Sequence, residues 1–182
     1  MKKKKNLLFC LIFAVVLLFG SLNVLAAGNT AASSKASAKS GWFNKGNKRY
    51  YRKADGKLYK NTVVKIGKYT YCFDKKGCLV KGAVKTKTKD MKRTDYYNKK
   101  NGRYEYSVLR LRIIQKTNTE IIARYGSSQY QIESGVKCYT KKGKELAFSN
   151  LKKNQRIDVY YNGSILEVYP AIIEGIQKIR LV

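Results

Sequence analysis

Histidine is absent from this chain of 182 residues, and its absence excludes several kinds of catalytic and metal-binding site. A serine–histidine or cysteine–histidine nucleophile cannot form, and neither can a histidine-ligated metal centre. General acid–base catalysis loses its most frequent agent as well. The sequence also lacks paired carboxylates at informative spacing, a phosphate-binding loop and a cluster of metal ligands. We therefore expect a protein without catalytic residues, metal or cofactor, which is not an enzyme.

Acidic residues are scarce, since 11 Asp and Glu side chains stand against 39 Lys and Arg side chains, for a formal net charge of +28. Residues 41–104 carry 20 basic against 4 acidic side chains, and residues 105–182 carry 13 against 7. Such a surface attracts anions, which outside a cell include teichoic acids, phospholipid headgroups, acidic glycans and nucleic acid. A basic surface that only keeps the protein soluble is the alternative. We favour weak, nonspecific attraction of polyanions.

Proline occurs once, at Pro170, while the strand-forming residues Tyr, Ile, Val and Thr are abundant. Short alternating segments bounded by glycine and polar residues follow one another from Gly41 onward, and this pattern is typical of β-strands joined by tight turns. The length from Gly41 to the C-terminus allows one or two small domains. The sequence therefore predicts an all-β fold.

Cysteine is also rare, and its number leaves the pairing open. Cys10 lies in an N-terminal apolar run, and Cys72, Cys78 and Cys138 follow it. Without Cys10 the number is odd, which leaves at least one thiol unpaired within a monomer. Cys72 and Cys78 flank a predicted turn and could form a disulfide, but they face opposite sides if Phe73 lies opposite Cys78. The Cys72–Cys78 disulfide and two free thiols are both open alternatives.

The N-terminus has the three parts of a secretory signal peptide. Lys2 to Lys5 precede an apolar run from Leu7 to Leu22, and the sequence Val24-Leu25-Ala26 suits signal peptidase. We predict residues 1–27 as the signal peptide, so that Cys10 is removed and no transmembrane span remains. An uncleaved membrane anchor is the alternative, since the apolar run approaches the roughly 20 residues that span a bilayer. We expect a protein that is secreted or associated with the cell wall.

Residues 28–40 contain only Gly, Asn, Thr, Ala, Ser and Lys. This composition buries almost no apolar surface and predicts a flexible linker. Folded structure is therefore expected to begin near Gly41, with a basic region at 41–104 and a second domain at 105–182.

The basic region contains a repeat that becomes visible when its glycines are aligned. The segment Tyr50–Leu58 (YYRKADGKL) matches Tyr71–Leu79 (YCFDKKGCL), and a weaker copy runs from Tyr96 to Tyr104 (YYNKKNGRY). Each copy consists of an aromatic strand, a polar turn closed by glycine and a short returning strand, which is the pattern of a β-hairpin. We therefore predict a solenoid-like region of β-hairpin repeats.

With Gly41-Trp42 before the first copy and Lys65–Tyr69 before the second, this region resembles the cell-wall-binding repeats of choline-binding and glucan-binding surface proteins. The resemblance implies a β-solenoid whose aromatic residues hold choline or stack on sugar rings. Carried over position by position, it implies ligand-binding roles for Trp42, Tyr50, Tyr51, Tyr69, Tyr71, Phe73, Tyr96 and Tyr97.

The copies depart from this family where it commonly has tryptophan. Arg49, Thr70 and Asp95 precede the aromatic pairs, and Gly82-Ala83 replaces Gly-Trp before the third copy. A positive surface also repels a cation such as choline. An anionic wall polymer, teichoic acid or glycan, held by Lys and Arg with tyrosines as lesser contacts, is therefore favoured over choline. The alternative role of the aromatic residues is packing across strands.

Residues 105–182 have longer alternating segments and less charge, which predicts a small barrel. The expected strands are 108–114, 120–125, 129–133, 137–139, 156–161, 164–169 and 177–182. Residues 148–154, 159–171 and 179–182 resemble a family of small secreted Gram-positive domains of uncharacterised function, thought to adopt an OB-like barrel. This second resemblance depends chiefly on Gly163, Glu167, Tyr169, Pro170 and Ala171.

Three positions of this domain carry specific expectations. Asn154 stands where the family has glycine, and asparagine tolerates the positive φ that the turn requires. Glu167 either contacts a ligand near the Tyr-Pro-Ala turn or has a structural role, as a cap of that turn or a partner for a lysine. Pro170 is expected at a bend or a sheet edge, since it cannot donate to a ladder.

Export, repeats and charge together predict a noncatalytic cell-surface protein that associates with the Gram-positive cell wall through its basic aromatic repeats. The alternative is a protein that binds nucleic acid as a nonspecific polyanion, because OB-like barrels and basic charge are both typical of such proteins. In that case the affinity should fall steeply with salt.

Overall fold

The structure, a computed structural model, describes residues 39–182. The predicted signal peptide, with Cys10, and residues 28–38 of the predicted linker lie outside the described residues. Within residues 39–182, no helix is long and apolar enough to cross a membrane.

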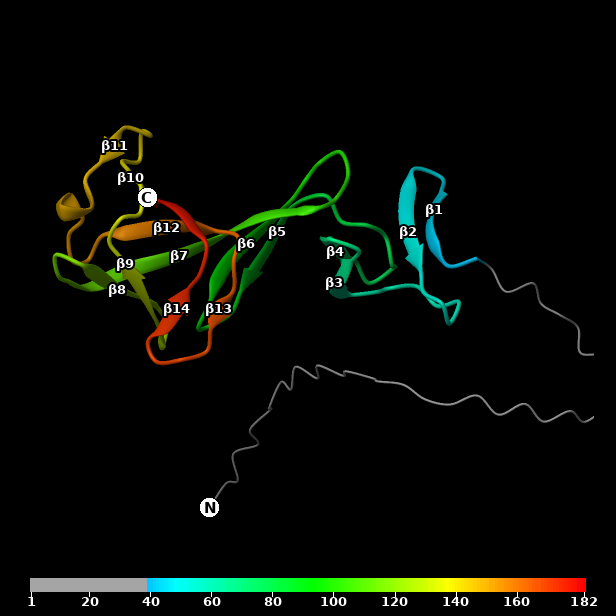
Figure 1. The fold of residues 1–182 in the computed structure, drawn as a ribbon, viewed down its shortest axis with the longest axis horizontal. Helices are drawn as coiled ribbons and strands as arrows, with labels where there is room; N and C mark the ends of the chain where they lie inside the picture. The colour runs from blue at the N-terminus through cyan, green and yellow to red at the C-terminus, as the bar shows by residue number, and fades with distance from the viewer. Residues whose placement is uncertain (1–38) are drawn as a thin grey trace, which may run out of the picture. The chain divides into compact units, whose positions relative to one another are not determined.

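The described chain is all-β, as the sequence predicts (Figure 1). Its one helical element is a 3-10 turn, η1 (Phe148–Asn150). The strands are β1 (Gly41–Lys45), β2 (Lys48–Arg52), β3 (Thr62–Ile66), β4 (Tyr69–Phe73), β5 (Gly82–Lys87), β6 (Lys92–Tyr97), β7 (Tyr104–Lys116), β8 (Glu120–Tyr125), β9 (Ser128–Glu133), β10 (Cys138–Tyr139), β11 (Glu145–Leu146), β12 (Arg156–Tyr161), β13 (Ile165–Leu166), β14 (Ala171–Ile173) and β15 (Ile176–Leu181). β1–β2 and β3–β4 are separate two-stranded sheets, and the other strands form one 11-stranded sheet.

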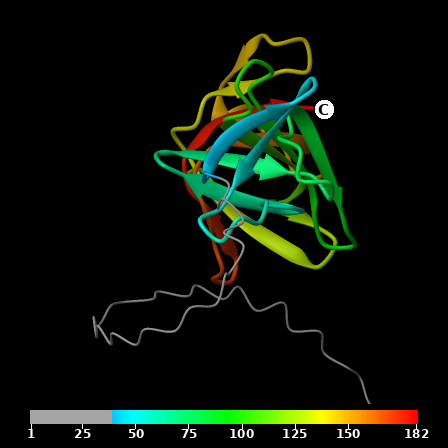
Figure 2. The same cartoon turned by 90° about the vertical axis from the view of Figure 1, so that its right-hand side faces the viewer.

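Three antiparallel hairpins, β1–β2, β3–β4 and β5–β6, follow one another along the repeat region. The aromatic strand of each predicted copy is the second strand of a hairpin, and the glycine-closed turn comes after it. The returning strand is a single bridge in the first two copies, Arg52 to Leu58 and Phe73 to Leu79. In the third copy it becomes β7, a strand of 13 residues in which half-buried and buried positions alternate from Tyr106 to Ile114, so that one side can cover a core. In Figure 2 the β1–β2 hairpin is nearest the viewer.

Glycine is required in the second and third of these turns for two reasons. Gly77 and Gly102 have φ angles of 84° and 73°, which residues with a side chain rarely adopt. A Cβ on Gly77 would also lie 3.0 Å from the Tyr59 carbonyl oxygen, and one on Gly102 would lie 2.8 Å from the side chain of Leu79. The turn of each copy therefore packs on the returning residues of the copy before it.

β7 is the strand around which the large sheet is assembled. It pairs with β6 along its first half, with β12 through its middle and with β8 toward its end. Its inward side chains Leu109, Leu111 and Ile113 are at most 1% exposed and join the hydrophobic core with residues of β8, β9, β12 and β15. Burial of each such side chain contributes about 1.5–3 kcal/mol.

The hydrogen-bonded order of the large sheet is β11-β10-β15-β12-β7-β8-β9-β14-β13, with β6 on β7 and β5 on β6. The third hairpin of the repeat region therefore shares a sheet with the C-terminal residues. Among the described strands, β11 and β13 stay at the ends of this order and do not pair with each other. The all-β class is confirmed, whereas the closed OB-like barrel stays a prediction.

The turn expectations can be compared directly with the backbone. Asn154 has a φ of 71°, so the predicted positive φ is confirmed. Gly163 is needed for close approach, because a Cβ there would lie 2.7 Å from the carbonyl group of Glu174. Pro170 follows a cis peptide bond in the loop between β13 and β14. The strand expected at 164–169 is shorter than predicted, because the chain bends after Leu166.

The turn after β5 is tied to the turn after β8. The carboxylate of Asp90 accepts hydrogen bonds from the backbone N–H of Ser127, at 3.1 Å, and from its hydroxyl. These bonds lower the pKa of Asp90. Gly126 has a φ of 59°, and a Cβ there would lie 2.2 Å from the Lys89 carbonyl oxygen. This turn clamp holds the end of the β5–β6 hairpin beside β8.

The three described cysteines are free thiols. Cys72 lies beside Tyr97, whereas Cys78 donates a hydrogen bond to the Tyr50 hydroxyl at 3.3 Å. The two thiols thus have different partners, and no disulfide joins them. Phe73 lies opposite Leu79 and not Cys78, so the register considered for cysteines on opposite sides is wrong. Burial raises the pKa of Cys138 to about 11 and also raises the pKa of Cys72. Because the thiolate is the reactive form, we expect both thiols to oxidise slowly at neutral pH.

Candidate functional site

Strands β6 and β7 carry different side chains on their two faces, and each face forms a candidate site. In a β-ladder, residues directly opposite each other point to the same side of the sheet. The pair Thr94–Val108 points outward, where both side chains are only half-buried. The neighbouring pair Asp95–Ser107 points to the other side, where both side chains are buried.

The outward side of the large sheet is strongly cationic, and we call it the basic face. It spans β5, β6, β7, β8, β12 and β15, whose alternating outward positions carry Lys or Arg. These cations are Lys85, Lys87, Lys92, Arg110, Arg112, Arg124, Arg156, Lys178 and Arg180. The acidic side chain that lies among them is Asp158, which is paired with Arg110 on one side and Arg180 on the other.

Asp158 fixes the positions of these two arginines. Its carboxylate is 4% exposed and accepts hydrogen bonds from Arg110 Nε to Oδ1 and from Arg110 Nη2 to Oδ2, both at 2.8 Å. Arg180 Nη2 lies 3.8 Å from Oδ2. The hydrogen bonds with Asp158 raise the pKa of Arg110. One carboxylate thus stands against two guanidinium groups, so the cluster keeps a positive charge in a geometry that bidentate pairing holds fixed.

Three tyrosines form a row of rings on the basic face. Tyr96 stacks on Tyr106 with ring centroids 4.7 Å apart, and the Tyr106 centroid lies 6.0 Å from that of Tyr160. Lys178 Nζ lies 4.7 Å from the Tyr160 ring centroid, and Arg180 Cζ lies 5.7 Å from it. Such rings can contact the flat or apolar parts of a polymer while the cations contact its anionic groups.

The basic face is hollowed in two places. A hollow of about 460 Å³ has a charged lining of Lys92, Arg110, Arg112, Arg124 and Arg156, without an acidic residue. A second hollow, of about 340 Å³, includes Lys92 and Arg110 as well, so the two are adjacent. A concave surface with charges of one sign focuses the electric field and raises the local concentration of anions.

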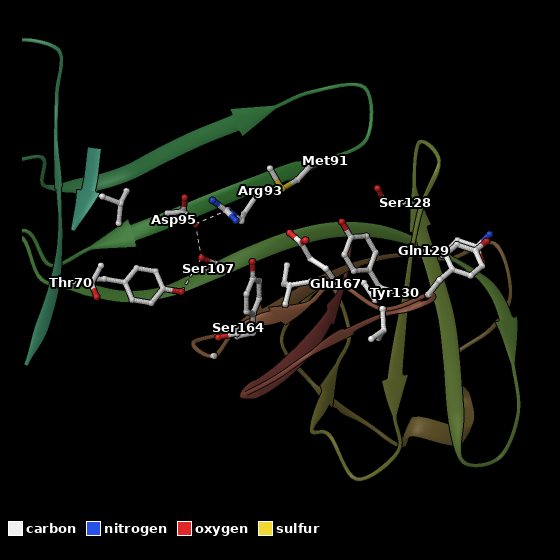
Figure 3. A pocket seen from close by; sticks show the side chains of 18 of the residues that line it. Thr70, Met91, Arg93, Asp95, Ser107, Ser128, Gln129, Tyr130, Ser164 and Glu167 are labelled. Atoms are coloured by element: carbon white, nitrogen blue, oxygen red, sulfur yellow. Dashed lines mark hydrogen bonds and ion pairs between the residues drawn. The ribbon is translucent and has the colours of Figure 1, made fainter. Parts of the chain in front are cut away.

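The opposite side of β6 and β7 faces a pocket of about 790 Å³, which we call the inner pocket (Figure 3). Its walls come from β6, β7, the turn between β8 and β9 with the start of β9, and the loop around β13. Val63 and Thr70 of the β3–β4 hairpin lie at one side. Segments that are far apart in the sequence therefore meet around one space.

A network of polar side chains forms one wall of the inner pocket (Figure 3). Ser107 Oγ donates a hydrogen bond to Asp95 Oδ1 at 2.5 Å and lies 2.9 Å from the Tyr104 hydroxyl. Arg93 Nε lies 3.0 Å from Asp95 Oδ1 as an ion pair, but this buried nitrogen has no hydrogen bond within the described residues. Burial opposes the charge of Arg93, yet attraction by Asp95 and Tyr161 outweighs it and raises the pKa of Arg93.

The rim of the inner pocket is apolar and exposed. Tyr169 is 78% exposed, Val168 is 55% exposed and Val63 is 56% exposed. Glu167 also lines the pocket and is exposed. No hydrogen bond or ion pair among the described residues involves its carboxylate, so the structural role considered for Glu167 has no contact to support it.

The aromatic residues predicted to bind a ligand are mostly packed against one another. Tyr71, Phe73 and Tyr97 are buried. The Trp42 ring meets the edges of Tyr51 and Tyr71, with centroids 5.1 and 4.8 Å apart. Tyr50 stacks on Phe43 and accepts the hydrogen bond from Cys78. Of the predicted set, Tyr96 belongs to the basic face and Tyr97 lines the inner pocket.

Cations of the protein itself cover several ring faces in the repeat region. Arg49 Cζ lies 4.6 Å from the Trp42 ring centroid, and Arg103 Cζ lies 3.6 Å from that of Tyr69. A bound choline would need ring faces of this kind. The arginines therefore compete directly for the positions that a choline cage requires.

The residues on which the second resemblance depends come together at one site, unlike the aromatic residues of the repeats. Gly163, Glu167, Tyr169 and Ala171 all line the inner pocket, and Pro170 lies between two of them. Sequence reasoning missed the basic face, although alternating cations at 85 and 87 and at 110 and 112 were a visible signal. It also missed the partnership of Arg93, Asp95 and Ser107, which only the pairing of β6 with β7 brings together.

Comparison with known proteins gives no relative from which a function could be transferred. No protein-family model matches the chain, and no curated protein matches it at a significant level.

Proposed function

We propose that the protein is a noncatalytic cell-surface protein that is secreted and binds anionic polymers of the Gram-positive cell wall, with teichoic acid as the expected partner. The observation that carries the proposal is the basic face, where cations from six strands surround one buried carboxylate. The third hairpin of the repeat region, β5–β6, is part of this face. The other hairpins add positive charge.

The expected binding is electrostatic, because a polymer of phosphodiesters gains affinity chiefly by releasing its counterions. A polymer that contacts six of the cations should lose affinity by about 10²- to 10³-fold between 50 and 200 mM salt. The tyrosine row contributes less, through contact with the carbon skeleton of the polymer. Choline is disfavoured as a partner, because arginines already cover the Trp42 and Tyr69 rings.

Nonspecific binding of single-stranded nucleic acid is the second candidate function. The observation that favours it is the row of Tyr96, Tyr106 and Tyr160 among cations, since bases stack on rings in such surfaces. A wall polymer without bases cannot stack in this way. Competition by single-stranded DNA and by a glycerol-phosphate polymer at equal phosphate concentration separates the two candidates.

The proposal is tested by retention of the mature chain expected after signal cleavage, residues 28–182, on purified Gram-positive cell walls. Walls with and without teichoic acid are compared at low and high salt. We expect retention only on walls that contain teichoic acid, and release by salt without choline. Equal retention on walls with and without teichoic acid, or no retention in any condition, would contradict the proposal.

Two variants show where on the protein the wall polymer binds. The basic-face variant replaces Arg112, Arg124 and Arg156 by Glu, and we expect it to lose retention. The repeat-charge variant replaces Lys45, Lys57 and Lys76 by Glu, which changes the net charge equally at exposed sites outside the basic face. It should keep most of its retention. Equal losses in the two variants would mean that net charge, and not the basic face, holds the polymer.

A further inference from the structure

We propose that the inner pocket is a second binding site, and that it takes a neutral saccharide instead of the anionic polymer of the basic face. The proposal depends on the size of the pocket, the polar groups in its wall, its charge and its exposed aromatic rim. It does not depend on the function proposed for the basic face, which lies on the other side of β6 and β7.

The inner pocket has the dimensions of a small-molecule site. Its volume of about 790 Å³ falls within the range of about 300–1,000 Å³ that is common for ligand pockets. That space accommodates a few linked sugar rings. Residues of the β8–β9 turn and the β13 loop face the β6–β7 wall across it, so a ligand would be contacted from both sides (Figure 3).

The polar groups of the pocket suit a ligand with many hydroxyl groups. Asp95 and Glu167 supply carboxylate acceptors, and Arg93 supplies guanidinium donors. Ser128 adds a hydroxyl that can both donate and accept. Donors and acceptors are thus mixed, as the hydroxyls of a sugar require, and the buried Nε of Arg93 is still without a hydrogen bond among the described residues.

The charge of the pocket distinguishes its ligand from that of the basic face. Among the described residues that line the pocket, Arg93 is the one cation, and Asp95 neutralises it at 3.0 Å. Glu167 is then left as a carboxylate without a cationic partner among these residues. The lining of the inner pocket therefore has no excess positive charge, although the protein as a whole has a net charge of +28. A phosphate or carboxylate ligand would be repelled by Glu167, whereas a neutral saccharide avoids that cost.

The rim supplies the apolar contact that sugar rings use. Tyr169 is 78% exposed, and Val168 and Val63, which line the same pocket, are more than half exposed. A planar ring that stands free of its own protein can stack on the apolar face of a pyranose. Tyr169 therefore differs from Trp42 and Tyr71 of the repeats, whose rings are packed against each other.

The test is ligand-observed NMR of the mature chain with two neutral oligosaccharides, maltotetraose and triacetylchitotriose, at up to about 10 mM, the range of weak binding. Glycerol phosphate serves as the anionic probe. We expect saturation transfer to at least one of the oligosaccharides, with an affinity that is unchanged in 1 M NaCl because charge does not drive it. Binding of glycerol phosphate in the pocket, or of neither oligosaccharide, would overturn the proposal.

Variants place the saccharide in the pocket. Tyr169→Ala removes an exposed ring without opening the core, and we expect it to weaken saccharide binding about five- to tenfold. Tyr169→Phe keeps the ring and should keep the affinity. Tyr160→Ala, a matched loss of a ring on the basic face, should leave saccharide binding unchanged. Equal affinities of Tyr169→Ala and the wild-type chain would reject the site.

The proposed function and this inference fail separately. Loss of wall retention in the basic-face variant with intact saccharide binding would support both sites as independent. Absence of wall retention leaves the saccharide result unaffected, because the two measurements use different ligands, and salt is expected to weaken only the binding of the wall polymer.

Discussion

The two sides of strands β6 and β7 differ more in chemistry than the two halves of the chain do. On one side, Lys92 and Arg110 belong to an open face of cations and tyrosines. On the other, Asp95 and Ser107 are buried and hydrogen-bonded beside a pocket with little net charge. Because successive residues of a strand point to opposite faces, one pair of strands presents two surfaces that suit different ligands.

This difference shows why net charge alone is a poor guide to what the protein binds. The chain has a net charge of +28, yet the inner pocket is lined by one arginine and two carboxylates. A polyanion is expected on the basic face only. Changes that disturb both faces, or one face alone, therefore test the distinction.

The largest effect on stability and binding is expected at Gly126, in the turn clamp that holds the β5–β6 hairpin beside β8 and so borders both faces. Gly126→Ala combines a φ of 59° with a Cβ 2.2 Å from the Lys89 carbonyl oxygen, so the turn clamp should open. We expect the free energy of unfolding to fall by about 3 kcal/mol and both kinds of binding to weaken, as measured by denaturant titration and ligand binding.

Gly46→Ala is the matched control for that change. Gly46 has nearly the same φ, 57°, but a Cβ there meets no atom within 4 Å. Gly46→Ala should lower the free energy of unfolding by only about 1 kcal/mol, which is the strain of the left-handed conformation. Equal losses in the two variants would show that the clamp contributes nothing to stability.

Gly163→Ala should disturb the inner pocket and leave the basic face intact. A Cβ there would lie 2.7 Å from the Glu174 carbonyl group, so the loop that carries Glu167 and Tyr169 has to move. We expect a loss of about 2 kcal/mol in stability with wall-polymer affinity unchanged. Ser164→Ala, at the exposed neighbouring position, is the control. A parallel loss of polymer affinity in Gly163→Ala would contradict the separation of the two faces.

Asp158→Asn tests whether the arginines of the basic face act by position or by charge alone. Arg110 is 38% exposed and regains water, so the stability loss should be about 1 kcal/mol, below the range for a fully buried pair. Polymer affinity should fall a few-fold although the net charge rises, because Arg110 and Arg180 lose their common anchor. Asp55→Asn is the control, because it changes the net charge equally at an exposed turn. If both variants bind the polymer more tightly, net charge and not the placement of Arg110 and Arg180 determines the affinity.

The smallest effect is expected at the tyrosine row. Tyr160→Leu removes a ring that Lys178 and Arg180 cover. Polymer affinity should fall by a factor of about two to five, at or below the low end for base stacking, because the polymer has no bases. Tyr160→Phe should bind like the wild-type chain. A tenfold loss in Tyr160→Leu for single-stranded DNA, with none for the wall polymer, would favour nucleic acid as the partner.

The sequence was sufficient for the fold class, the repeat and several turn positions, because these depend on local patterns. Alternation predicts strands such as β12, and Gly77 and Gly102 show the repeat directly. The short strands β11 and β14 were not predicted, since two or three residues carry no period and form only by pairing with distant partners. The extension of the third returning strand into β7 also depends on distant pairing.

The candidate sites were only partly predictable for the same reason. The motif around Glu167 and Tyr169 does lie at the inner pocket, as a ligand role for Glu167 required. Its partners Arg93, Asp95 and Ser107 could not be assigned, because the pairing of β6 with β7 determines which side chains share a face. The basic face likewise needs the register of six strands, which composition does not contain.

The most direct test of the two-face account is the salt dependence of binding to a soluble glycerol-phosphate polymer. The wild-type chain, the basic-face variant and the repeat-charge variant are titrated over a series of salt concentrations. The account predicts that the slope of log affinity against log salt becomes shallower by about 2 in the basic-face variant, for three lost phosphate contacts, and changes little in the repeat-charge variant. Equal changes of slope in the two variants would contradict it, because the polymer would then respond to net charge and not to one face of the sheet.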